Sequence, residues 1–136
     1  MFAVQYLARM ALTDVLLTSL QATPGARIVD VSAGGTVNVT FDFDNLQGEK
    51  HYNGAHALQH ESIANDMLVL EWARRNPALT FYNYGPGVVR TTLLRDMPAW
   101  FRLMAEVAGW VMSISAEQAA EDVLTLLTSA LGSGLY

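Results

Sequence analysis

Cysteine is absent from this sequence of 136 residues, and charged residues make up only 15% of it. The missing cysteines exclude disulfides, thiolate catalysis and zinc sites built on cysteine. The few Lys and Arg residues form no basic cluster, and the formal net charge of −5 argues against nucleic acid as a partner. No basic stretch precedes the first apolar segment, so we expect no secretory signal and a cytoplasmic protein.

Long uninterrupted hydrophobic runs are missing as well, because Arg9, Asp14, Arg102 and Glu106 break the most apolar segments. We therefore expect no membrane span. Hydrophobic residues nevertheless make up 51% of the chain, which is high for a small monomer. This balance predicts a single domain over residues 1–136 that covers part of its apolar surface by homo-oligomerisation.

The apolar pattern alternates between helical and extended spacing. Long helices are predicted over about 2–21 and 55–75, and further helices over 98–113 and 115–129. Ser115, with Gln118 three residues on, is expected to cap the last of these helices. Short apolar runs at 27–32 and 79–85 predict buried strands, segment 36–41 predicts a hairpin after Gly34-Gly35, and the closing GSGLY leaves room for a last strand. This order predicts an α/β fold with a small, mostly parallel sheet of about three strands flanked by long helices.

Five stretches carry a resemblance to a known family: ARIVDVSAGG, FDNLQGEKHYNG, IANDMLVLEWARR, NYGPGVVRTTLLRD and AEDVLTLLTS. In this order and spacing they resemble the C-terminal half of a short-chain dehydrogenase/reductase, closest to its retinol-dehydrogenase-like branch. The resemblance implies a truncated Rossmann-like three-layer fold that corresponds to the substrate-side half of the family. The glycine-rich turn that holds a dinucleotide, G-x-G-x-x-G, does not occur in the sequence.

The resemblance also implies that the family's catalytic set is replaced. Its serine falls at Ala33, the tyrosine of Tyr-x-x-x-Lys falls at Leu58 and the lysine falls at Ser62; the supporting asparagine falls at Gln5. Hydride reduction needs a proton donor beside the carbonyl and a cation that lowers the pKa of the donor. We therefore expect no nicotinamide redox chemistry in the isolated chain and no cofactor.

Two histidines four residues apart, His56 and His60, precede Glu61 and suggest a metal site. The motif of zinc peptidases fails, because its glutamate follows the first histidine and not the second. At helical spacing both histidines point about 160° away from Leu58 and Ser62, toward another helix or a subunit interface. We predict no metal site, and a catalytic role for His60 and a structural role remain open. Asp42–Asn45 lacks the ligand spacing of a calcium loop.

The carboxyl ends of parallel strands predict a pocket, because ligands of such sheets bind there. The residues expected to bind substrate are Ser32, Ala33, Leu58, Pro86, Met97, Trp100 and Phe101. Those expected to be catalytic are Ser62, Tyr52, Tyr84 and His60. Such an apolar, aromatic cavity suits a hydrophobic small molecule. The alternative is that these side chains only fill space.

These inferences favour a cofactor-independent, non-redox enzyme of secondary metabolism. It would be an isomerase, a dehydratase or a cyclase, including a pericyclase of the Diels–Alder type, that works by orientation and proton transfer. The alternatives are a non-catalytic pseudoenzyme that pairs with itself or with an intact dehydrogenase, and half of an oxidoreductase completed by another chain. Oligomerisation is expected through the two long helices, and the edge strand at 27–32 needs a cover.

Overall fold

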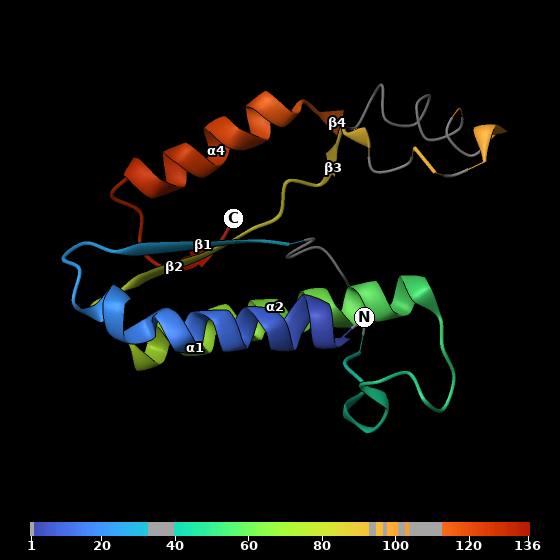
Figure 1. Ribbon diagram of the computed structural model, residues 1–136, viewed down its shortest axis with the longest axis horizontal. Coiled ribbons are helices and arrows are strands. Elements are labelled where there is room, and N and C mark those ends of the chain that lie inside the picture. The colour runs from blue at the N-terminus through green and yellow to red at the C-terminus, as the bar shows by residue number, and fades with distance from the viewer. Residues whose placement is uncertain (1, 33–39, 93–94, 97, 101–102, 104–112) are drawn as a thin grey trace.

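The computed structural model describes residues 2–32, 40–92, 95–96, 98–100, 103 and 113–136 (Figure 1). A π-helical turn (Ala3–Leu7) leads into α1 (Ala8–Gln21), and strand β1 (Arg27–Val31) follows. After a 3₁₀ turn (Phe43–Asn45) come α2 (Gly54–Arg75), β2 (Thr80–Tyr84) and β3 (Val88–Val89). The last elements are β4 (Ser113–Ile114), α4 (Ala116–Thr128) and β5 (Gly134–Leu135). Among the described residues, no helix is both long and apolar enough to cross a membrane.

The main sheet has the order β1-β2-β5 and is parallel throughout. Figure 1 shows α1 and α2 on one side of this sheet and α4 on the other. The predicted fold class is therefore confirmed: the chain is α/β, with a small parallel sheet of three strands between helices. A second parallel pair joins β3 to β4.

Two predicted elements lie mostly outside the described residues. Of the helix predicted over 98–113, the described residues Ala99, Trp100 and Leu103 are helical, whereas Ser113 begins β4 because it pairs with Val88. Most of the hairpin predicted at 36–41 also lies outside them, and the described residues Thr40 and Phe41 are not in a strand.

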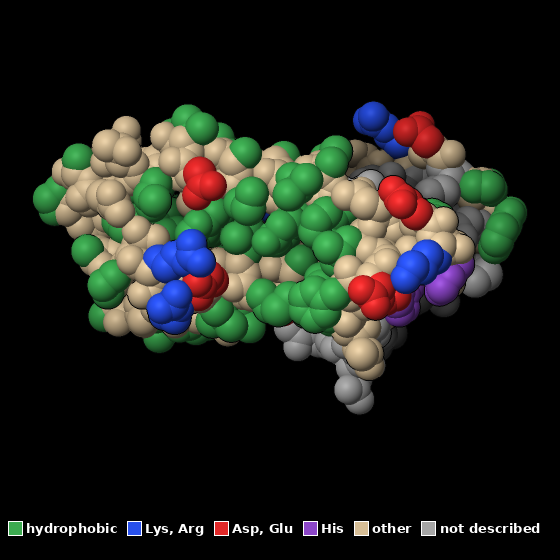
Figure 2. All heavy atoms as spheres, turned by 90° about the horizontal axis from the view of Figure 1, so that it is seen from below, with side chains coloured by type: hydrophobic (Ala, Val, Ile, Leu, Met, Phe, Trp, Pro, Cys, Tyr) green, Lys and Arg blue, Asp and Glu red, His purple; other side chains and the backbone are tan. Residues whose placement is uncertain are grey.

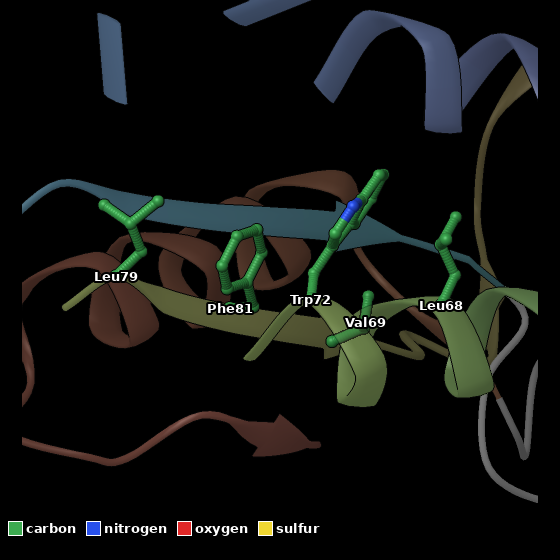
Figure 3. Packing of buried hydrophobic residues seen from close by; sticks show 5 residues of the cluster. All are labelled: Leu68, Val69, Trp72, Leu79 and Phe81. Carbon is green, nitrogen blue, oxygen red and sulfur yellow. The ribbon is translucent and has the colours of Figure 1, made fainter. Parts of the chain in front are cut away.

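The hydrophobic core has one part on each face of the sheet, because successive residues of β2 point to opposite faces. Phe81 points toward α1 and α2, where it packs with Leu68, Val69 and Trp72 of α2 and with Leu79 (Figure 3). The rings of Trp72 and Phe81 stack with centroids 6.0 Å apart. Tyr82 points to the other face and packs with Leu126 of α4. Each face of β2 therefore has its own hydrophobic cluster.

Both ends of α4 are capped. Ser115 accepts a hydrogen bond from the Gln118 amide at 3.1 Å, which confirms the predicted N-cap. At the other end the Arg27 guanidinium donates to the Leu126 and Leu127 carbonyls at 3.2 and 2.9 Å and also to the Ser129 carbonyl. A cation at the carboxyl end of a helix is favourable. Arg27 therefore ties β1 to α4.

The outer edge of β1 is partly covered by α1. The Ser32 amide donates to the Tyr84 carbonyl, so the main-chain N–H and C=O groups of the even-numbered residues point toward β2. The main-chain groups of Val29 and Val31 therefore point away from β2, to the outer edge of the sheet. Arg9 of α1 donates to the Val31 carbonyl at 2.9 Å. Among the described residues, no strand pairs with this edge. At Val31, the expected cover of the outer edge of β1 is thus provided by the first helix.

Candidate functional site

The residues predicted to form one pocket lie at several places. Ser32 directly follows β1 and Tyr84 ends β2. Leu58, His60 and Ser62 lie in the first half of α2, and Tyr52 and Pro86 lie in loops. Leu58 and Trp100 are exposed, at 47% and 63%, so these two side chains do not line a closed cavity. Ala33, Met97 and Phe101 lie outside the described residues.

A polar cluster lies at the carboxyl ends of β1 and β2, on the side of α1 and α2. The Ser32 hydroxyl donates to Asn83 Oδ1 at 2.8 Å, and Asn83 Nδ2 donates to Asp66 Oδ1 of α2. Asn83 is 1% exposed, and the register places Asp30 beside it on β1. We did not predict Asn83 as a site residue. The signal in the sequence was one amide among the aromatic residues of TFYNY.

A partly buried ion pair completes this polar cluster, which consists of Arg9, Asp30, Ser32, Asp66 and Asn83. Arg9 of α1 donates to the Asp30 carboxylate and, through the same nitrogen, to the Val31 carbonyl. Burial raises the pKa of Asp30 and the Asp66 carboxylate raises it further, although Arg9 acts in the opposite direction. The polar cluster therefore places two carboxylates and one cation where helices and strand ends meet.

Buried oxygen atoms of three polar side chains of α2 have no hydrogen-bond partner among the described residues. They are both carboxylate oxygens of Glu61, Ser62 Oγ and Asn65 Oδ1, and each of these residues is at most 3% exposed. Burial raises the pKa of the Glu61 carboxyl. Ser62 thus lies inside the protein, on the helix that also carries Asp66, rather than at an open surface.

The histidines lie beside a small cavity of about 40 Å³ at the start of α2. Tyr52, His56, His60 and Glu61 are among its lining residues, and a cavity of this size holds about one water molecule. His60 Nε2 lies 3.2 Å from the Thr40 carbonyl oxygen and 3.4 Å from the Asp42 amide nitrogen. His60 thus faces the 40–42 loop rather than another helix, because this loop folds over the start of α2. Among the described residues, no three side chains are placed to hold a metal ion.

Tyr84 lies on the opposite side of the sheet from the polar cluster. Its hydroxyl donates to Asp122 Oδ2 of α4 at 2.6 Å. This hydrogen bond to a carboxylate, together with burial, raises the pKa of Tyr84 to about 12, and the same bond lowers the pKa of Asp122. A tyrosine with a raised pKa is a weaker proton donor at neutral pH.

The Tyr84 hydrogen bond predicts a late tyrosinate step. Because the pKa is raised on folding, the stabilisation is fully present below pH 10 and is lost as the pH rises through about 12. We expect the absorbance titration of the five tyrosines to include a step near pH 12 that Tyr84→Phe removes. The control Tyr52→Phe, at an exposed position, should keep that step; a titration of Tyr84→Phe that still shows it would contradict the assignment.

Curated proteins similar to this chain are mostly retinol dehydrogenases, and no protein-family model matches it. Human retinol dehydrogenase 11 is 34% identical over 134 residues, which cover 97% of this chain and 41% of that protein. Bovine retinol dehydrogenase 12 is 36% identical over 95 residues, or 68% of this chain and 30% of that protein. Oxidoreductase andH of Emericella variicolor is 29% identical over 128 residues, which cover 93% of this chain and 38% of that protein. The chain thus spans about two fifths of the length of these relatives, or less.

These similarities correct the function expected from the sequence. The relatives are named dehydrogenases and an oxidoreductase, and nothing supports a cyclase, isomerase or dehydratase. The expectation of a cofactor-independent, non-redox enzyme was wrong because it rested on the replacements expected at the family's catalytic positions and gave too little weight to the match along the whole chain. With 97% of its residues matched at 34% identity, the chain belongs to the short-chain dehydrogenase/reductase family, as a relative of the retinol dehydrogenases.

Proposed function

We propose that the chain serves in NAD(P)-dependent oxidoreduction of a hydrophobic alcohol or carbonyl compound. In this proposal it is the substrate-side part of a retinol-dehydrogenase-like enzyme. The observation that carries the proposal is the similarity to human retinol dehydrogenase 11 along nearly the whole chain. The polar cluster supports it, because ligands of parallel α/β sheets bind beyond the carboxyl ends of the strands.

The residues of this chain do not by themselves fit a dinucleotide. The sequence has no G-x-G-x-x-G turn, whose amides and following helix would hold a pyrophosphate. Leu58 has no proton to donate, and Ser62 is buried and uncharged. We therefore assign to this chain the binding and orientation of substrate, and no step that involves the nicotinamide.

Within that role the polar cluster holds Ser32 in place. The bonds from Ser32 to Asn83 and from Asn83 to Asp66 connect the ends of both strands to α2. Asn83 is buried, so these hydrogen bonds compete little with water. The Ser32 hydroxyl donates its proton to Asn83, so its oxygen can accept a hydrogen bond from the hydroxyl of a bound alcohol and orient it.

The test is an oxidoreductase assay of the protein at its natural length. Retinal and a linear long-chain aldehyde are supplied with NADPH, and the loss of absorbance of the reduced nicotinamide is followed. We expect NADPH oxidation that depends on the aldehyde, and NADP⁺ reduction with the matching alcohol. A protein that shows neither reaction, with NAD(H) or NADP(H), would refute the proposal.

The second part of the proposal concerns self-association through α1 and α2. Figure 2 shows hydrophobic side chains gathered on the face that these helices form. In α1, which is described in full, Asp14 is the only charged residue among the exposed ones. The large exposed hydrophobic residues of the two helices and the preceding turn are Val4, Leu7, Leu12, Val15, Leu16, Leu58, Met67 and Leu70.

The total exposed area of the chain supports an interface in which a partner covers this face. The chain exposes 9253 Å², whereas a compact monomer of 14.9 kDa exposes about 7,000 Å². The excess is larger than the roughly 800 Å² that each partner buries in an interface of standard size. A second copy of the chain offers an equally uncharged surface, so we infer a homodimer through this face.

Val15→Glu is expected to disrupt this homodimer. Val15 is 79% exposed, so the new carboxylate costs the monomer little but would be buried without a cation in the dimer. We expect the dissociation constant to rise by at least about 100-fold, measured by light scattering across a dilution series. Leu124→Glu on α4, at a position 59% exposed, is the matched control and should leave the mass unchanged. A monomeric wild type at high concentration, or a dimeric Val15→Glu, would contradict the inference.

A further inference from the structure

The face of the sheet that carries α4 has a cavity that the proposed function does not use. Its volume is about 200 Å³, and it lies at the end of β2 next to α4 and the last residue of the chain. Its lining residues are Tyr84, Asp122, Thr125, Leu126 and Tyr136. The polar cluster lies on the other face, so this cavity is a separate place in the molecule.

One carboxylate gives the cavity its charge. Asp122 accepts hydrogen bonds from Tyr84 at 2.6 Å and from Gln118 at 3.1 Å, and both donors are neutral. The bond from Tyr84, followed by that from Gln118, lowers the pKa of Asp122, so the carboxylate is ionised at neutral pH. Among the described residues, no Lys, Arg or His forms an ion pair with it.

The other lining residues are aromatic or apolar. Leu126 is 5% exposed and forms part of the hydrophobic cluster on this face. The Tyr136 ring is held by a hydrogen bond from its hydroxyl to the Gly132 carbonyl at 3.0 Å and by an edge contact with Tyr82, with ring centroids 5.7 Å apart. Aromatic rings attract cations through their negative faces. The cavity thus combines a carboxylate, two tyrosine rings and an aliphatic wall.

We propose that this cavity binds a small organic ammonium ion. The ammonium group pairs with Asp122, and the carbon chain lies against Leu126 and Tyr136. Tyr84 fixes the orientation of the carboxylate through its hydrogen bond. The volume is below the roughly 300–1,000 Å³ of sites for drug-sized ligands, so the ligand is smaller than a retinoid.

The charge distribution excludes two other ligand classes from this cavity. An anion would meet the ionised Asp122 without a compensating cation among the described residues. A metal ion would need further ligands, and no described group of three His, Asp or Glu residues is placed to hold one. An alkylammonium ion satisfies both the charge and the apolar wall.

The test compares two probes of nearly equal shape, n-butylammonium and n-butanol, on the wild-type protein by NMR of the leucine methyl groups. We expect butylammonium to shift the Leu126 methyl signals and to saturate in the millimolar range, with butanol at least about tenfold weaker. Equal binding of the two probes would overturn the proposal. So would the absence of any shift when the butylammonium concentration is raised to about 50 times that at which saturation is expected.

Two variants of α4 provide the matched comparison. Asp122→Asn should weaken butylammonium binding at least about tenfold, whereas Glu121→Gln, the same change at a neighbouring exposed residue, should leave it unchanged. Circular dichroism checks that both variants fold. If Asp122→Asn does not fold, the comparison of the two probes on the wild type decides. Wild-type affinity in a folded Asp122→Asn would refute the site.

Discussion

Replacing Phe81 by alanine is expected to lower the free energy of unfolding by about 3–5 kcal/mol. Phe81 is fully buried in β2 and stacks on Trp72, so the truncation leaves a cavity between the sheet and the two helices. Because β2 is the central strand, its neighbours cannot move in to fill the space without losing their own pairing. Urea unfolding followed by circular dichroism, at one fixed protein concentration, measures the loss.

The matched control is Phe43→Ala. Phe43 is 70% exposed, so the same truncation removes little buried surface and should cost below about 1 kcal/mol. A loss for Phe81→Ala that is no larger than this control would contradict the packing described for the cluster in Figure 3.

Asn83→Asp is expected to destabilise the protein by about 3–5 kcal/mol at neutral pH. The change keeps the shape of the side chain but replaces the amide that donates to Asp66 by a third carboxylate beside Asp30 and Asp66. Arg9 is the only cation of the polar cluster, and it already pairs with Asp30. An unpaired charge at a position 1% exposed therefore has no compensation within the polar cluster.

The pH dependence identifies the cause of this loss. Burial and the neighbouring carboxylates would raise the folded-state pKa of the new carboxyl above its unfolded value of about 3.9. The variant should therefore approach wild-type stability below that pH and lose stability as the pH rises through the raised pKa. Asn53→Asp is the control, because Asn53 is exposed and accepts the His56 amide at 3.1 Å near the start of α2, where a carboxylate is tolerated. A pH-independent loss in Asn83→Asp would contradict the charge account.

Much of the fold follows from local patterns in the sequence. The apolar runs of RIVDV and TFYNY gave strands close to their observed bounds, and Ser115 with Gln118 gave the start of α4. These predictions succeeded because strand formation and helix capping depend on residues only a few positions apart. The resemblance to the short-chain dehydrogenases succeeded for a similar reason, since it depends on residue order alone.

The single pocket predicted at the strand ends depended on contacts between distant residues. Tyr84 and Asn83 are neighbours in the chain, but a strand directs them to opposite faces, so Tyr84 meets Asp122 and Asn83 meets Asp66. The alternation of side chains along a strand predicts that Asn83 and Tyr84 point to opposite faces of the sheet. It does not predict which of them faces α2, because that depends on which side of the sheet each connecting helix crosses.

The sequence by itself thus determined the fold class, the parallel order of the strands and the family, because these follow from periodicity and residue order. Only the tertiary structure decided the polar cluster. Arg9, Asp30, Ser32, Asp66 and Asn83 come from two helices and two strands and meet only when these elements pack. The tertiary structure likewise buries Ser62 and exposes Leu58 on the same helix, because the packing direction of α2, and not its sequence spacing, selects the side that the core covers.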